Sequence, residues 1–196
     1  MNLVQYQVVI KGTRKLICHN AEFLADPISE ISKRMKEITG VRKKTEEHYK
    51  QMADIEWVGG LYLDEKKVPV MPFTCLKGMM TEAARKHKLG KDVKCGLEVM
   101  DSPVIEHDGP KNATADDLLT NPRFRDRRLV IVNRNKVMRT RPCFPVWQVK
   151  FNVQIDPEII KENDLMSILE TGGRVTGLGD YRPEFGKFEV VSCKKV

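Results

Sequence analysis

The chain has 196 residues, of which 41% are hydrophobic and 31% are charged, and its formal net charge is +7. This length is sufficient for one full hydrophobic core, and the composition is typical of a globular protein. No apolar run reaches the roughly 18 to 20 residues of a membrane span, and the N-terminal residues lack the basic and apolar regions of a signal peptide. We therefore expect one domain over residues 1–196, cytoplasmic and without a membrane partner.

The first part of the chain predicts a strand followed by a helical insertion. Apolar residues alternate over residues 4–10, as in a strand with one buried face. A short amphipathic helix is predicted to begin at Asp26-Pro27, because an N-cap aspartate followed by proline is a typical helix start. A second helix is predicted to begin at Thr45. Both lie in an insertion of about 20–60.

The next predicted helix begins at Pro72, after a compact hairpin. It continues to about Lys88, with apolar side chains such as Phe73 and Leu76 on its inner face. Loop signals then dominate, and a short strand is expected at 97–100.

The C-terminal part of the chain predicts a strand, a helix and a strand. Residues 146–155 alternate most clearly. The pair Asp156-Pro157 is again a predicted helix start, and the last strand is expected over 185–191. Together with the earlier elements this gives a β-α-β-β-α-β order. The order indicates an α+β, ferredoxin-like fold, with an antiparallel sheet, two core helices and a helical insertion after the first strand.

A basic block lies between residues 121 and 150. It contains nine basic residues and one acid, and seven of the nine are arginines, whose planar side chains suit phosphate contacts and base stacking. Residues 127–141 predict a β-hairpin that turns near Asn133, because asparagine tolerates the left-handed backbone conformation. The alternative to a nucleic-acid contact is that the basic block forms a solvated surface, with its charge balanced by acids elsewhere in the protein. The candidate nucleic-acid contacts in this basic hairpin are Arg127, Arg128, Arg134, Lys136, Arg139 and Arg141.

A glycine-rich loop is predicted over residues 172–186, which contain five of the 13 glycines. Glycines among cations and aromatic residues favour a surface that meets a polyanion, and a helix C-cap followed by turns is the alternative. Tyr181 is expected to be exposed, whereas Trp147 and Phe188 are expected in the core. The candidate contacts in this loop are Arg174, Gly177, Gly179, Tyr181, Arg182 and Lys187.

No pattern in the chain predicts a catalytic site. Gly177 and Gly179 follow a helix and precede a strand, which is the reverse of a nucleotide-binding loop. The histidines lack an evident partner for acid-base chemistry. His107 lies between Glu106 and Asp108, which would make a weak metal site. The cysteines never form a Cys-x-x-Cys pair. We expect no enzyme activity, no cofactor and no metal.

Two motifs carry a family resemblance: Pro72 followed by Leu-Lys-Gly at 76–78, and Gly177, Gly179 and Gly186 before the last strand. They resemble the backbone subunits of the RAMP superfamily, the RRM-like proteins of CRISPR effector complexes. The resemblance implies binding of a single strand by a groove, a projecting hairpin at 127–141 and the glycine-rich loop, and it adds Lys77 to the candidate contacts. The chain also resembles, nearly end to end, uncharacterised proteins of phage and prophage genomes that share the Leu-Gly-Asp-aromatic-Arg-Pro pattern of residues 178–183. This resemblance implies a bacterial host cell.

These observations favour a non-enzymatic single-stranded nucleic-acid-binding protein of phage or mobile-element origin. By resemblance we expect a homo-oligomer that assembles head to tail into filaments along RNA or DNA. A second hypothesis is a RAMP-type endoribonuclease with His19 or His48 as general base. A third is a phage-encoded inhibitor or interaction protein that acts on a host complex through its basic face. The motifs do not distinguish RNA from DNA.

Overall fold

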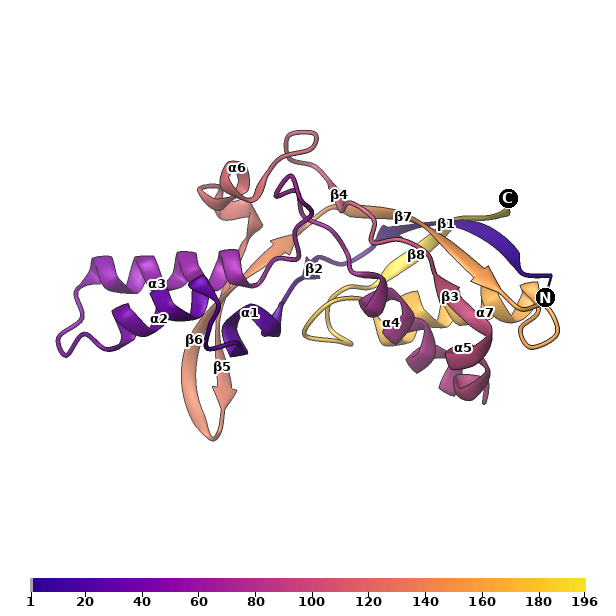
Figure 1. Cartoon of the computed structure of the whole chain (residues 1–196), viewed down its shortest axis with the longest axis horizontal. Coiled ribbons are helices and arrows are strands. Elements are labelled where there is room, and N and C mark those ends of the chain that lie inside the picture. Colours follow the sequence, from indigo (N-terminus) through magenta and orange to yellow (C-terminus); the bar gives the residue numbers. More distant parts are fainter. Residues whose placement is uncertain (1) are drawn as a thin grey trace.

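The fold is built around an antiparallel sheet, seen in a computed structural model that describes residues 2–196 (Figure 1). The sheet order is β3-β7-β1-β8, and every neighbouring pair is antiparallel. A further short strand, β4, pairs with the start of β7. The strands of this sheet are β1 Val4–Gly12, β3 Leu97–Val99, β4 Glu106–His107, β7 Trp147–Ile155 and β8 Phe188–Lys195.

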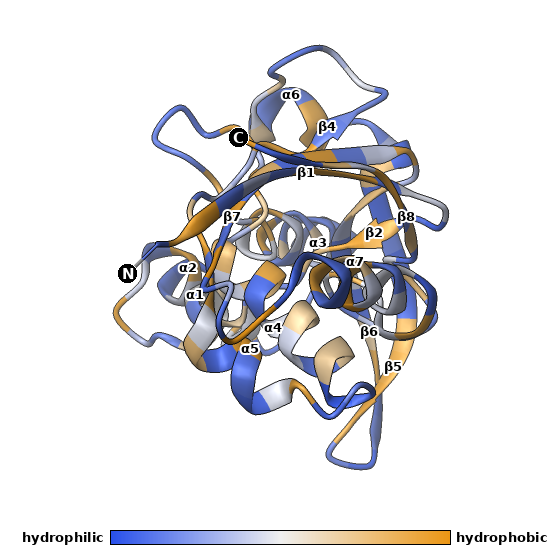
Figure 2. Ribbon diagram, turned by 90° about the vertical axis from the view of Figure 1, so that its right-hand side faces the viewer, coloured by the Kyte–Doolittle hydropathy of each residue, from blue (hydrophilic) through white to orange (hydrophobic). Residues whose placement is uncertain are grey.

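Helices α4 (Phe73–Arg85) and α7 (Glu162–Thr171) cover one face of this sheet (Figure 1, Figure 2). The alternating strands explain why: Val8 and Phe151 lie opposite each other in the register and are fully buried, whereas their sequence neighbours lie on the other face. Burial of one such side chain stabilises the fold by about 1.5–3 kcal/mol. No helix within residues 2–196 is long and apolar enough to cross a membrane.

A second sheet, of order β2-β6-β5, lies beside three helices inserted after β2 (Figure 1). Strands β5 and β6 form a hairpin that projects from the molecule. Its turn consists of Asn133 and Arg134, which both have positive φ, as a two-residue turn of the I′ type requires. These elements are β2 Leu16–Ile17, α1 Ala21–Ala25, α2 Glu30–Thr39, α3 Glu46–Gly59, β5 Arg125–Val132 and β6 Asn135–Phe144. The remaining elements are α5 Gly90–Gly96, α6 Ala115–Leu119, the 3-10 turn η1 Pro122–Phe124 and the π-helical turn η2 Gly172–Thr176.

Large aromatic side chains fill the core between these parts. Trp57 of α3 is fully buried, and its indole N–H donates to the carbonyl of Phe124 at 2.7 Å. Trp147 and Phe188 are also buried, which confirms the prediction for both. Phe73 is 49% exposed, so its predicted inward position was wrong. Phe73 is the first residue of α4, so no earlier turn of the helix shields its side chain from solvent.

Both helices for which an Asp-Pro start is predicted begin later. The N-cap of α2 is Ser29. The carboxylate of Asp26 instead accepts a hydrogen bond from the N–H of Ile28 at 3.0 Å, and that of Asp156 accepts from Glu158 at 3.0 Å. In each case the aspartate closes a turn two residues further on rather than capping a helix.

The glycine-rich segment begins as helix, which corrects the predicted loop over 172–186. Residues 172–176 continue α7 as a π-helical turn. A Cβ on Gly173 would lie 2.1 Å from the carbonyl oxygen of Phe188, so glycine here lets the helix end close onto the sheet. Irregular backbone occupies the following residues, and the last strand therefore starts three residues later than the predicted 185–191.

Candidate nucleic-acid interface

The projecting hairpin and the loop after η2 meet through stacked side chains. The guanidinium carbon of Arg128 in β5 lies 4.6 Å from the ring centroid of Phe185 and 5.0 Å from that of Tyr181. The two rings are 5.7 Å apart, and Nζ of Lys15 lies 4.9 Å from the Phe185 ring. Each cation is attracted to the aromatic face by about 0.5–2 kcal/mol. These four side chains form a stacked cluster that joins the basic hairpin to the glycine-rich loop.

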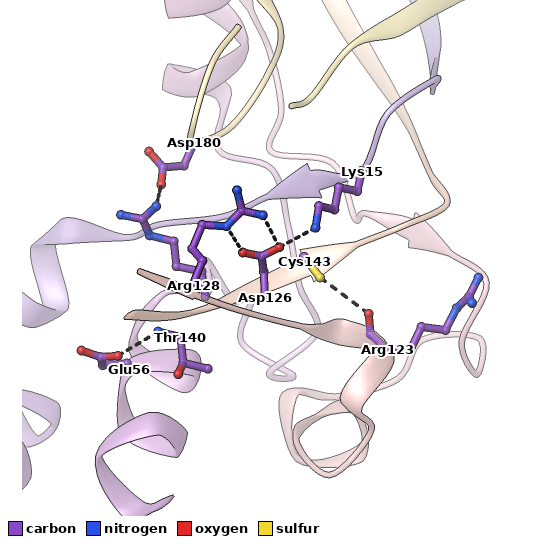
Figure 3. A network of polar contacts seen from close by, with 9 residues as sticks. Lys15, Glu56, Arg123, Asp126, Arg128, Thr140, Cys143 and Asp180 are labelled. Atoms are coloured by element: carbon purple, nitrogen blue, oxygen red, sulfur yellow. Dashed lines mark hydrogen bonds and ion pairs between the residues drawn. The ribbon is translucent and has the colours of Figure 1, made fainter. Parts of the chain in front are cut away.

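A buried carboxylate holds the two cations of the stacked cluster in place (Figure 3). Oδ2 of Asp126 accepts hydrogen bonds from Nη2 of Arg128 at 2.6 Å and from Nζ of Lys15, and Oδ1 accepts from Nε of Arg128. Burial by itself raises the pKa of the Asp126 carboxyl, but these hydrogen bonds outweigh it and hold that pKa below its ordinary value. Arg128 is therefore fixed by a charged partner while its flat side lies over the rings.

Arg139 and Arg141 are also paired within the chain. Glu56 of α3 accepts hydrogen bonds from Nη1 of Arg139 and, at 2.9 Å, from the backbone N–H of Thr140. Nη1 of Arg141 lies 2.9 Å from Oδ2 of Asp180. The two arginines therefore anchor the base of the hairpin. A phosphate that contacts either of them has to compete with Glu56 or Asp180.

Part of the hairpin's positive charge is in no ion pair with another residue between 2 and 196. It belongs to the exposed side chains of Arg134 and Lys136 in the outer half and of Arg127, which lies opposite Thr140 near the base. Leu129 and Ile131 share a face with Arg127 and are 55% and 73% exposed. Figure 2 shows this apolar stretch of β5 on the projecting part of the hairpin. Cations interleaved with exposed apolar groups are suited to contact both phosphates and unstacked bases.

The cations after α7 differ in whether they are exposed or bound to other groups of the chain. Arg174 is exposed and lines, together with Arg14, a hollow of about 690 Å³. Lys187 lines the same hollow, but its Nζ donates to two backbone carbonyls of η2 at 2.9 and 2.7 Å. It therefore acts as a cap of the π-helical turn. Arg182 forms an ion pair with Glu82 at 3.1 Å.

Glycines of the loop make close contacts within the chain itself. A Cβ on Gly186 would lie 1.7 Å from the carbonyl oxygen of Leu178, and one on Gly179 would lie 2.4 Å from that of Ile17. Both glycines have positive φ, as does Gly177. Close packing of the loop onto its own backbone therefore requires glycine here. Direct contact of Gly177 and Gly179 with nucleic acid stays a prediction.

His48 and His107 make contacts within the fold, and His19 is partly buried. Nδ1 of His48 accepts a hydrogen bond from the backbone N–H of Thr45 at 3.0 Å and caps α3. Burial lowers the pKa of His19, which favours the neutral ring at pH 7. His107 packs edge-on against Phe124, with ring centroids 5.2 Å apart. In the described part of the chain, no three His, Cys, Asp or Glu side chains lie close enough together to hold a metal ion.

Sequence patterns single out neither Lys15 nor Arg14 as site residues. The available signal is weak: two adjacent cations directly after the strand break at Gly12. Lys77, which the family resemblance adds, lies half-buried on α4. Within residues 2–196 it forms no ion pair and no ring contact with the stacked cluster.

Comparison with known proteins yields similarity to solved structures alone. No family model matches the chain, and no curated protein matches it. The chain is similar to a chain of the Type III-B Cmr-beta, determined by cryo-EM bound to cognate target RNA, with 13% sequence identity and a TM-score of 0.47. The match covers 99% of this chain and 61% of that chain, so this protein spans less than two thirds of its length.

Proposed function

We propose that the protein binds single-stranded nucleic acid through a connected surface formed by the projecting hairpin and the loop after η2. The observation that carries the proposal is the stacked cluster, in which Arg128 of the hairpin lies over Tyr181 and Phe185 of the loop. Through this contact, the cations of the outer hairpin and the Tyr181 ring, which is 42% exposed, belong to one surface.

The chemistry of this surface matches a single strand. Arg127, Arg134 and Lys136 are free of ion pairs with the other described residues, and they are the cations available to phosphates. Tyr181 offers a ring face to an unstacked base, a contact that contributes about 1–3 kcal/mol per base. A duplex keeps its bases stacked and cannot use that ring, so single strands are the favoured ligand.

We further propose that the core is ferredoxin-like and of the RAMP type. In chain order the core elements are β1, α4, β3, β7, α7 and β8, and the first and third of these strands lie at the centre of the sheet. This is the β-α-β-β-α-β pattern with two helices on one face. Pro72 is the N-cap of α4, and Gly177 and Gly186 precede β8, which supports the placement of the two sequence motifs.

Copies of the protein are proposed to assemble along the strand as a homo-oligomer. Support comes from the exposed apolar side chains of the projecting hairpin, such as Leu129 and Ile131, which a neighbouring copy can cover. Repeated contacts between unlike surfaces extend into open filaments unless the rotation closes a ring.

The salt dependence of strand binding tests the proposed interface. The double variant Arg134→Gln/Lys136→Gln removes two cations from the outer hairpin. The matched control, Lys91→Gln/Lys94→Gln, removes the same charge from α5, far from the hairpin (Figure 1). Fluorescence anisotropy with labelled RNA and DNA strands over a range of salt concentrations gives the slope of log K against log salt.

We expect the hairpin variant to flatten this slope by about 0.7 for each lost phosphate contact. The control should retain the slope of the unmodified protein. Equal slopes for the unmodified protein, the hairpin variant and the control would show that the hairpin is not part of the interface. The same titrations compare RNA with DNA directly, and a duplex competitor shows whether single strands are preferred.

A further inference from the structure

A cleft of about 550 Å³ lies between the helical insertion and the base of the hairpin. Its volume is within the range of about 300–1,000 Å³ that is usual for clefts that bind small ligands. One wall is apolar and includes Ala25, Met35 and Met52 from the three helices. The facing wall carries His19, Arg139 and Arg141.

The arginines on this wall keep hydrogen-bond donors without a partner. Nε of Arg141 is buried and makes no hydrogen bond within residues 2–196, and its Nη1 has only the ion pair with Oδ2 of Asp180 at 2.9 Å. An unsatisfied buried donor costs about 1–3 kcal/mol and is rare in native structures, so an acceptor is expected at this place. Arg139 uses Nη1 for Glu56, which leaves its other N–H groups available.

The carboxylate in the wall, that of Glu56, is already in use, so the ligand must bring its own negatively charged acceptor. Both carboxylate oxygens of Glu56 accept hydrogen bonds, one from Arg139 and one from the backbone of Thr140. Two guanidinium groups with free donors match the geometry of a phosphate. Methionine side chains such as Met35 adapt their shape to a flat ring. A nucleoside phosphate combines both features.

We propose that the cleft binds one nucleotide of the strand, with the ring against the methionine wall and the phosphate at Arg139 and Arg141. This inference rests on the proposed function, because Asp180 beside Arg141 directly precedes Tyr181 in the chain. A strand stacked on Tyr181 thus lies next to Asp180 and Arg141, and its adjacent nucleotide is the one that enters.

Titration of the full chain with adenosine monophosphate, adenosine and inorganic phosphate tests the cleft directly. We expect the nucleotide to bind more tightly than either of its parts. Ala25→Trp fills the cleft without removing a charge, and Ile28→Trp is the matched control, since Ile28 is 76% exposed and outside the cleft. Ala25→Trp should weaken nucleotide binding by about tenfold or more because it occupies the space of the ring. Arg141→Gln should have a similar effect because it removes a phosphate contact of about 1.4 kcal/mol or more.

The same variants show whether the nucleotide belongs to a strand. Ala25→Trp should lower strand affinity severalfold while the salt slope stays unchanged, because the hairpin cations are untouched. Unaltered strand affinity together with lost nucleotide binding would assign the cleft to free nucleotides and overturn the inference. Absent nucleotide binding in a protein that still binds strands would also overturn it, and would leave the proposed function standing. A protein that binds the nucleotide but no strand would refute the proposed function itself.

Discussion

Replacing Arg128 with glutamine tests whether the stacked cluster fixes the hairpin to the loop. The change removes two charge-assisted hydrogen bonds to Asp126 and two ring contacts. Asp126 is only 6% exposed and would keep Lys15 as its remaining charged partner. The variant therefore leaves a buried carboxylate that is partly, not wholly, unpaired.

The expected loss can be worked out from these contacts. Weakened hydrogen bonding to a buried charge costs about 1.5–3 kcal/mol, and the lost ring contacts add about 0.5–1 kcal/mol. The free energy of unfolding should fall by about 2–4 kcal/mol, which corresponds to a decrease in Tm of about 4–16 °C for a chain of this size.

The pH dependence has a definite sign. The hydrogen bonds lower the pKa of the folded Asp126 carboxyl, so its contribution to stability is present above the unfolded pKa of about 3.9 and is lost as the pH falls through the folded pKa. The gap in stability between the unmodified protein and Arg128→Gln should therefore be full at neutral pH and shrink in acid.

Thermal unfolding followed by circular dichroism, at neutral pH and near pH 3, measures both effects. Arg134→Gln is the control, because Arg134 is exposed and forms no ion pair with another described residue. Its stability should stay within about 0.5 kcal/mol of the unmodified protein. Equal Tm values for the two variants at neutral pH would refute the structural role of the stacked cluster.

Three further outcomes are expected. Gly186→Ala should lower the free energy of unfolding by more than about 2 kcal/mol, since its Cβ would lie 1.7 Å from a carbonyl oxygen, whereas Gly78→Ala, with open space around the Cβ, should not destabilise the protein in the same thermal assay. His48→Ala should leave strand binding intact, and labelled RNA should stay uncut on a gel with the unmodified protein. Cleavage that is lost in His19→Ala or His48→Ala would support the ribonuclease hypothesis instead. The mass of complexes should grow with strand length in mass photometry, and a single 1:1 complex on all strands would contradict assembly.

Local patterns in the sequence predicted the elements that depend on neighbouring residues. The alternation of 146–155 is a property of one strand with one buried face, and β7 occupies almost the same residues. The hairpin turn was also predictable, because Asn133 tolerates the positive φ that the turn needs. The predicted helix start at Asp26 was wrong for a related reason. An aspartate side chain can close a turn or cap a helix, and the local sequence is the same in both cases.

The division of the site into paired and unpaired cations could not be predicted from the sequence. Arg139 pairs with Glu56 and Arg141 with Asp180, and each pair joins segments that are distant in the chain. Lys15 likewise lies in the stacked cluster because β2, which directly follows it, pairs with β6. Such pairings depend on the tertiary arrangement, whereas composition shows only where charge accumulates.

The ion pairs at the base of the hairpin explain how the unpaired cations near its turn, Arg134 and Lys136, can be held in place. A two-stranded hairpin is marginally stable by itself, so a projecting one needs anchors at its base. On one side Glu56 ties β6 to α3, and on the other side Asp126 orients Arg128 onto the loop rings. The acids that neutralise the base, among them Glu56, Asp126 and Asp180, lie outside the outer half, which keeps its full positive charge. Stability and affinity should therefore separate along this hairpin: substitutions near the base act first on folding, and substitutions near Arg134 act first on binding.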